Sequence, residues 1–103
     1  MSTFSEIING EKPVLVDFYA EWCGPCKVMK PILKELKIKL GESTTILQID
    51  VDKSPQTASY YQIQGVPTLI LFKKGKPVWR QSGVVSMVEL ERVVATHHQS
   101  IIP

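Results

Sequence analysis

The residues of this sequence best suited to chemistry are its two cysteines, Cys23 and Cys26, which are separated by Gly24 and Pro25. They follow an apolar segment and open a segment with helical periodicity. Cysteines three residues apart in the first turn of a helix lie on one face, close enough to form a small disulfide ring. This position and spacing indicate reactive thiols rather than two inert buried ones.

The expected helix also explains how one thiol would be activated. Cys23 falls at its N-terminus, where unpaired backbone amides and the helix dipole favour an anion. Lowering a thiol pKa from about 8.5 to about 7 takes about 2 kcal/mol, and a helix end with its amide hydrogen bonds supplies about 1–2 kcal/mol. No neighbouring histidine is therefore required, and Pro25 costs little because its missing N–H would be unpaired there. We expect Lys27 to support the active site only weakly, because it is solvated.

Two cysteines could also be ligands of a zinc ion, which is the alternative to a redox-active pair. Zinc usually takes four ligands, and the only histidines are His97 and His98. Adjacent residues on a helix point about 100° apart, so both rarely reach one metal. We therefore expect no metal, and we interpret the two histidines as a solvated helix end.

Composition limits the remaining classes of function. The chain has 103 residues, of which 44% are apolar and 21% charged, and its net charge is +2. This predicts a single domain over residues 1–103 with a radius of gyration of about 13 Å. There is no basic surface for nucleic acid and no apolar stretch of membrane-spanning length. The N-terminus resembles no signal peptide, so we expect a cytoplasmic protein.

The elements that would position the cysteines can be read from capping and periodicity. They are a short helix opened by Thr3–Glu6, a strand over 14–19 and a helix from Cys23 to about Gly41. A buried strand over 44–51 follows, and then a short helix with Ser54 as its N-cap and Pro55 as its first residue, which runs to about Tyr61. Strands over 68–72 and 78–82 and a last helix opened by Ser86–Glu89 complete the order. Alternation with helices predicts parallel pairing for the first strands, and the Lys74-Gly75 turn predicts an antiparallel hairpin at the edge.

Asp17 interrupts the otherwise apolar strand over 14–19. With apolar neighbours on both sides, we expect it to be buried and its pKa to be raised by desolvation. The alternative is a surface aspartate on an edge strand.

Residues 16–27, Val-Asp-Phe-Tyr-Ala-Glu-Trp-Cys-Gly-Pro-Cys-Lys, resemble the active-site segment of the thioredoxin family. The resemblance extends from about Val14 to the last helix through Pro31, Val66-Pro67-Thr68, Lys74-Gly75 and Gly83. It implies an α/β thioredoxin fold, with a central mixed sheet flanked by helices on both faces. Because the usual N-terminal strand is missing, we expect four strands.

The resemblance implies a dithiol–disulfide oxidoreductase with protein substrates. Cys23 would be the exposed nucleophile, and Cys26 the more buried thiol that resolves the mixed disulfide, leaving a Cys23–Cys26 disulfide. Asp17 would be the general base for Cys26. No other cofactor is implied, and electrons would come from a thioredoxin reductase or another donor. Tyr19 and Gln48 depart from the family pattern, at positions where relatives often carry Trp and Lys. Losing that lysine should raise the pKa of Asp17 further.

The substrate surface is also implied by the resemblance. Pro67 would follow a cis peptide bond that lays the Val66 backbone beside Cys23, where it can pair with an extended substrate segment. A flat apolar rim would be formed by Trp22, Gly24, Pro25, Val66 and Gly83. Core packing is the alternative for Trp22. We interpret Tyr60 and Tyr61 as packing residues.

Several alternatives stay open at this point. The same residues would serve a dedicated electron donor for one partner enzyme. A disulfide isomerase or oxidant is less compatible with Gly24-Pro25, and a purely structural binding module is less compatible with intact cysteines. We expect a monomer, because no large apolar stripe is left unassigned. Residues 97–103 carry no motif, and Ile101 and Ile102 either dock or fray.

Overall fold

The computed structural model describes residues 3–98. Its elements follow the predicted order: α1 (Phe4–Ile8), β1 (Val14–Tyr19), α2 (Gly24–Leu40), the 3₁₀ helix η1 (Gly41–Ser43), β2 (Thr45–Asp50), α3 (Pro55–Tyr60), β3 (Thr68–Lys73), β4 (Lys76–Ser82) and α4 (Met87–His98). The radius of gyration is 13.0 Å, as expected from the chain length. Ile101 and Ile102 lie outside the described residues.

The four strands form one mixed sheet in the order β2-β1-β3-β4. β1 and β2 are parallel, whereas β3 is antiparallel to both β1 and β4. The predicted parallel pairing therefore holds for β1 and β2 and does not extend to β3. A strand of six residues spans about 20 Å, and a helix of six residues only about 9 Å. Because α3 is too short to carry the chain back along the sheet, β3 starts at the end where β2 finished.

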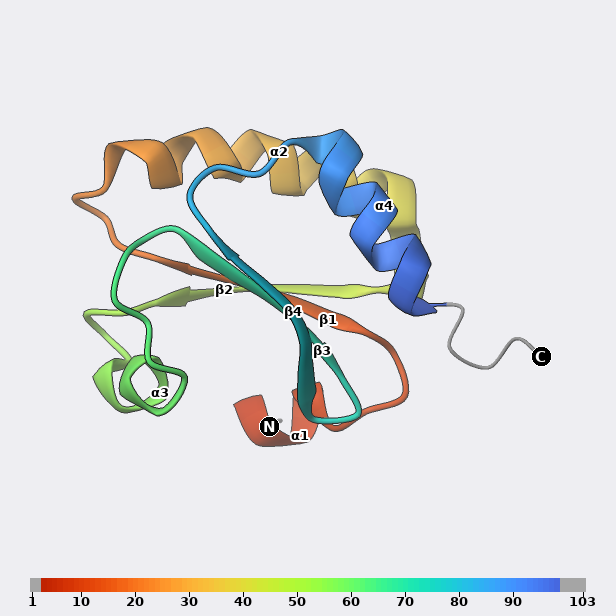
Figure 1. Ribbon diagram of the computed structural model, residues 1–103, viewed down its shortest axis with the longest axis horizontal. Helices are drawn as coiled ribbons and strands as arrows, with labels where there is room; N and C mark the ends of the chain where they lie inside the picture. The colour runs from red at the N-terminus through yellow and green to blue at the C-terminus, as the bar shows by residue number, and fades with distance from the viewer. Residues whose placement is uncertain (1–2, 99–103) are drawn as a thin grey trace.

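Helices cover both faces of this sheet, with α2 and α4 on one side and α1 and α3 on the other (Figure 1). Successive side chains of β1 point to opposite faces of the sheet and pack into the core on each face. Leu15 joins the core beneath α2 and α4, whereas Val16 and Phe18 join the core on the α1 side. The strand over 44–51 was expected to be buried, and this was wrong for most of β2, which is half-buried. The reason is its place at the sheet edge, with β1 as its only partner strand among residues 3–98.

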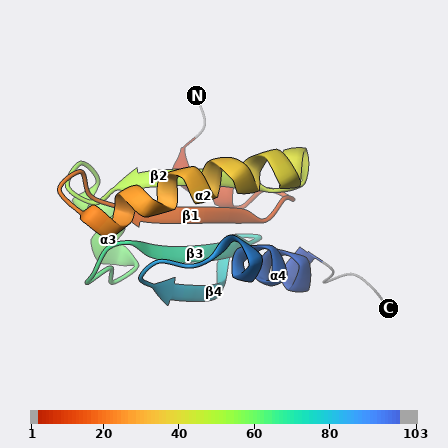
Figure 2. The same ribbon diagram turned by 90° about the horizontal axis from the view of Figure 1, so that it is seen from above.

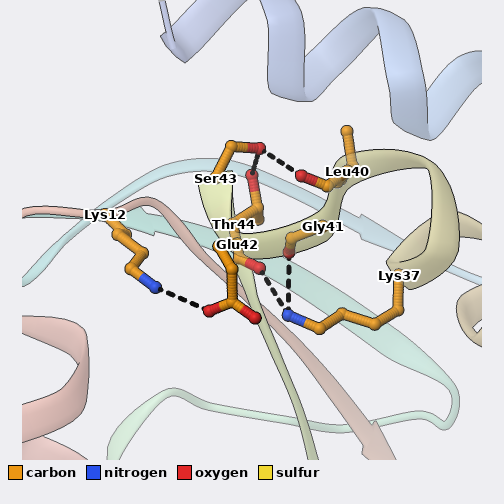
Figure 3. Close-up of polar contacts among 7 residues, drawn as sticks. All are labelled: Lys12, Lys37, Leu40, Gly41, Glu42, Ser43 and Thr44. Atoms are coloured by element: carbon orange, nitrogen blue, oxygen red, sulfur yellow. Dashed lines mark hydrogen bonds and ion pairs between the residues drawn. The ribbon is translucent and has the colours of Figure 1, made fainter.

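The long helix α2 connects the cysteines to the core. Cys23 is its N-cap, Pro31 lies inside it, and Met29, Leu33 and Leu36 are buried on its inner face. It ends at Gly41, where φ is 58°. Figure 3 shows how this end is held: the Lys37 amine donates to the carbonyl oxygens of Gly41 and Thr44, at 2.9 and 3.3 Å. Nearby, Lys12 pairs with Glu42 at 3.5 Å.

The predicted helix caps are only partly formed. Thr3 and Glu6 make the complete capping box of α1. Ser54 precedes α3 with Pro55 in its first turn, but the Ser54 side chain makes no capping bond. Ser86 accepts the Glu89 N–H at 3.2 Å, whereas the Glu89 carboxylate pairs with Arg92 instead of returning to Ser86.

The β3–β4 turn is tied to α1. Lys74 and Gly75 both have positive φ, and the Gly75 N–H donates to the Ile8 carbonyl at 2.8 Å. A Cβ at Gly75 would lie 2.1 Å from Asn9 Oδ1, so a side chain there requires the contact to move. Of the helices within residues 3–98, none combines the length and apolarity needed to cross a membrane.

Candidate functional site

The two cysteines are joined by a disulfide at the N-terminus of α2, with their Cα atoms 5.3 Å apart. Cys23 has extended backbone geometry, and its Sγ accepts the backbone N–H of Cys26 at 3.1 Å. The predicted position of the pair at the helix start is therefore confirmed. An amide donor directed at Cys23 Sγ favours negative charge on that sulfur when the disulfide is opened.

The expected contrast in exposure between the two cysteines is not found in this oxidised structure. Cys23 is 4% exposed and Cys26 2%, so the expectation of an exposed Cys23 was wrong. Cys23 packs with Ala20 and Cys26, and Val66 lies against this cluster. Its Sγ is 3.6 Å from the Val66 carbonyl oxygen. The loop before β3 therefore covers the sulfur that the sequence placed at the surface.

That loop contains the expected Val66-Pro67-Thr68. The peptide bond between Val66 and Pro67 is cis. The Thr68 hydroxyl donates to the Gly65 carbonyl at 2.6 Å, and the Gly83 N–H donates to the Pro67 carbonyl at 2.8 Å. These two bonds fix the loop from both sides. The structure thus brings Val66 against Cys23 and links Gly83 to Pro67.

Trp22 is 72% exposed, so core packing is excluded for it. Its indole Nε1–H donates to Asp52 Oδ2 at 2.8 Å. Asp50 forms the turn that presents Asp52, because Asp50 Oδ1 accepts the N–H groups of Asp52 and Lys53 at 2.9 and 3.3 Å. Sequence reasoning missed Asp52. The available signal was an Asp-x-Asp turn directly after a strand.

A pocket of about 110 Å³ lies between Trp22 and the Val66 loop, and it is lined by Trp22, Val51, Ile63, Gln64, Gly65 and Val66. Three further residues lie beside the cysteines in the first turns of α2. Lys27 is exposed, as expected. Pro25 lies in the first turn of α2. Gly24 has no heavy atom within 4 Å of the place where a Cβ would be, so nothing crowds this side of the helix start.

Asp17 is 0% exposed on the central strand β1, which excludes the surface alternative. Its Oδ2 accepts from the Gln48 side-chain amide at 3.5 Å, and its Oδ1 has no hydrogen-bond partner among residues 3–98. Burial raises the pKa of Asp17 from 3.8 to about 6, and the Gln48 hydrogen bond and the Lys30 charge oppose that rise. A carboxyl group with this pKa can accept and release a proton near neutral pH.

The three tyrosines occupy different environments. Tyr61 packs at the edges of Phe4 and Phe72, with ring centroids 6.0 and 5.1 Å away. Tyr60 is 78% exposed, so its interpretation as a packing residue was wrong. Its ring centroid lies 4.9 Å from that of Tyr61, in an edge-on arrangement. Tyr19 lies under the Lys30 amine, 5.8 Å from the ring centroid.

Within residues 3–98, no three or more side chains of His, Cys, Asp or Glu are grouped so that they could hold a metal ion. Among these residues the site consists of one disulfide, one buried carboxyl group and the backbone that surrounds them. This arrangement can exchange its disulfide with another and can move one proton.

Comparison with known proteins agrees with this geometry. The family model described as Thioredoxin matches residues 1–96. A thioredoxin-like protein of Synechocystis is 50% identical over 90 residues, which cover 86% of each chain. The thioredoxin of Alicyclobacillus acidocaldarius is 44% identical over 94 residues, 91% of this chain and 90% of that protein. A bifunctional thioredoxin reductase/thioredoxin of Mycobacterium leprae is 42% identical over 91 residues, 88% of this chain and 20% of that protein.

Proposed function

Because this chain belongs to the thioredoxin family, we propose that Cys23 is its nucleophile, Cys26 its resolving thiol and Asp17 its general base. The chain is a thiol–disulfide oxidoreductase that reduces protein disulfides through its own redox-active disulfide, with no other cofactor. One observation supports the assignment of roles most directly. The Cys26 N–H points at Cys23 Sγ, and no backbone amide donates to Cys26 Sγ among residues 3–98.

The reaction starts from the dithiol form. The Cys23 thiolate attacks one sulfur of a substrate disulfide, forming a mixed disulfide and releasing the other substrate sulfur as a thiolate. Cys26 then loses its proton, and its thiolate attacks Cys23 Sγ. The Cys23–Cys26 disulfide forms, and the second substrate sulfur leaves as a thiolate. In total the substrate gains two electrons and two protons, and the two cysteines are oxidised.

Asp17 takes the proton of Cys26 in the second step. Its burial supports this role, because a carboxylate with a pKa near 6 is a stronger base than an ordinary aspartate. The unpartnered Oδ1 is the atom we assign to the proton, since Oδ2 is already engaged by Gln48. In the oxidised structure Cys26 carries no thiol proton, so its sulfur cannot donate a hydrogen bond to the unpartnered Oδ1.

The substrate binds across the rim around Cys23. An extended segment lies along Val66 and Pro67 on one side and Trp22 on the other, and Gly24, Pro25, Lys27 and Gly83 complete the surface. The Val66 carbonyl oxygen lies 3.6 Å from Cys23 Sγ, so the backbone of this loop is next to the reacting sulfur. Backbone pairing of this kind tolerates many substrate sequences.

Family membership implies disulfide-containing protein substrates and a thioredoxin reductase as electron donor. The fused reductase and thioredoxin of M. leprae supports that donor. We further propose that the chain acts as a monomer in the cytoplasm. Sedimentation velocity tests the monomer, and fractionation of cells with an antibody to the chain tests the location.

Trapping experiments test the roles of the two cysteines. Cys26→Ser should accumulate a Cys23-linked mixed disulfide with a disulfide-bonded protein substrate and lose multiple turnover. Cys23→Ser should lose both the covalent adduct and turnover. Nonreducing mass spectrometry distinguishes these outcomes, with Met29→Leu in the buried face of α2 as a matched control for folding. An adduct that forms on Cys26 in Cys23→Ser, and not on Cys23 in Cys26→Ser, would reverse the assignment.

A further inference from the structure

The two edge strands of the sheet are protected to different degrees. The edge strand of a sheet has unpaired backbone N–H and C=O groups with which another strand can pair. Proteins prevent such pairing by placing Lys, Pro or a β-bulge in the edge strand. β4 has all three devices: it carries Lys76 and Pro77, and its register with β3 shifts between Leu71 and Phe72. β2 reads Thr-Ile-Leu-Gln-Ile-Asp, with no basic residue or proline, and pairs with β1 in continuous register. β2 is therefore the unprotected edge.

The outward-facing backbone of β2 can be identified from its hydrogen bonds. The N–H groups of Thr45 and Val51 donate toward the β1 side, to Pro13 and Tyr19. Backbone direction alternates along a strand, so the N–H and C=O groups of Ile46 and Gln48 point to the outer edge. Among residues 3–98, β2 has no second partner strand to receive them.

A groove of about 430 Å³ runs beside this edge, between β2 and α2, and it is lined by Lys30, Leu33, Lys34, Lys37, Ile46 and Gln48. Figure 2 shows α2 lying along the β2 side of the sheet. The apolar part of the groove lining comes from Leu33 and Ile46. The Lys37 amine is occupied by two carbonyl oxygens at the end of α2 (Figure 3). Lys30 and Lys34 form no ion pair with any residue from 3 to 98.

The charge of this groove selects its occupant. Pairing of β2 with β2 of a second copy would bring two lysine-lined grooves together, and like charges oppose that contact. A segment with Asp or Glu at alternate positions would place every acidic side chain on one face of its strand. Those side chains would meet Lys30 and Lys34, while its backbone pairs with Ile46 and Gln48.

We propose that the outer edge of β2 and the adjoining lysine groove form a docking surface for an extended acidic segment of a partner protein. The segment adds to the sheet as a further strand beside β2. This surface lies on the side of the sheet away from β3, whose preceding loop holds Val66 against Cys23. The docking surface is therefore distinct from the rim around Cys23, although two of its residues, Gln48 and Lys30, also act on the buried Asp17.

The test uses the full chain and a capped peptide of alternating Glu and Val, with alternating Lys and Val as the control peptide. We expect the Glu-Val peptide to protect the amides of Ile46 and Gln48 from hydrogen exchange, measured residue by residue by NMR. The double variant Lys30→Glu with Lys34→Glu should weaken binding by about tenfold or more. Lys74→Glu with Lys76→Glu makes the same charge change at the other edge and should leave binding unchanged.

Four outcomes would overturn the proposal. The first is equal binding of the Lys-Val and Glu-Val peptides, and the second is protection of β4 amides from hydrogen exchange in place of β2 amides. The third is an equal loss of peptide affinity in the two double variants. The fourth is protection of the Ile46 and Gln48 amides in the peptide-free chain together with dimerisation of that chain. The last outcome would assign the edge to a second copy. The two peptides are compared on the unmodified chain, so the result stands even if a variant fails to fold.

Discussion

The side-chain amide of Gln48 donates to the buried carboxylate of Asp17 across the β1–β2 pair, with 3.5 Å between Nε2 and Oδ2. The two residues are direct partners in the register of the parallel strands. Gln48 also lines the groove beside α2, so this bond connects a fully buried group to an exposed one. Gln48 partly offsets the effect of burial on Asp17, whose pKa nevertheless reaches about 6.

Removing this hydrogen bond should raise the pKa of Asp17 above about 6, because the Gln48 N–H stabilises the charged carboxylate. Gln48→Leu is the variant, and the carboxyl carbon of Asp17 followed by NMR against pH is the measurement. Gln81→Leu, an exposed amide on β4, is the control and should change nothing. An unchanged or lowered pKa in Gln48→Leu would show that the bond does not stabilise the charge.

Asp17 should make the oxidised protein less stable as pH rises from about 4 to about 6. In that range the folded state keeps the Asp17 proton and the unfolded state has released it, so the free energy of unfolding falls with pH. A rise in pKa from 3.8 to about 6 corresponds to a loss of up to about 3 kcal/mol above pH 6.

Asp17→Asn tests this directly. It should unfold in urea at a higher concentration than the wild type at pH 7, by an amount approaching the same free energy, and the two should converge near pH 4. Glu35→Gln, an exposed carboxylate on α2, controls for loss of charge. A wild-type stability that does not vary between pH 4 and 7 would contradict the assignment of a raised pKa in the folded state.

Asp52 should hold Trp22 in the orientation that substrates meet. Asp52→Ala removes the acceptor of the indole N–H, and a charge-assisted bond at an exposed site contributes about 1 kcal/mol. We expect KM for a protein disulfide to rise about fivefold with little change in kcat. Asp52→Asn keeps an acceptor and should recover most of the loss. If both variants bind substrate as the wild type does, Asp52 has no part in positioning Trp22.

The adjacent tyrosines of α3 should differ sharply in their contribution to stability. Tyr61→Ala removes the ring contacts with Phe4, Phe18 and Phe72 and should lower the free energy of unfolding by about 3 kcal/mol. Tyr60→Ala, at a side chain that is 78% exposed, should change the free energy of unfolding by less than about 0.5 kcal/mol. Thermal unfolding of the two variants, side by side, measures the difference; similar losses would mean that Tyr60 also packs.

Much of the site could be predicted from short-range pattern. Cys23 and Cys26 share one turn of α2, and the spacing alone placed them on one face at a helix start. Asp17 sits among apolar neighbours on its own strand, so its burial and raised pKa followed from local sequence. The capping box of Thr3 and Glu6 likewise involves residues three apart. In each case the interacting groups are close along the chain.

The remaining features join residues that are far apart in the sequence. Cys23 meets Val66 across 43 positions and Trp22 meets Asp52 across 30. Those contacts exist only after the strands have paired, because chain direction and loop length decide which residues become neighbours. The same assembly sets β3 antiparallel to β1 and leaves β2 at the edge of the sheet.

The sequence by itself therefore determined the type of chemistry, since a helix start and a buried strand are produced by interactions within a few residues. Tertiary structure decided how that chemistry is reached: Cys23 is covered by the Val66 carbonyl, and the groove beside β2 is open. Accessibility depends on which distant segments pack over a residue. No local pattern contains that information, because the covering atoms belong to another part of the chain.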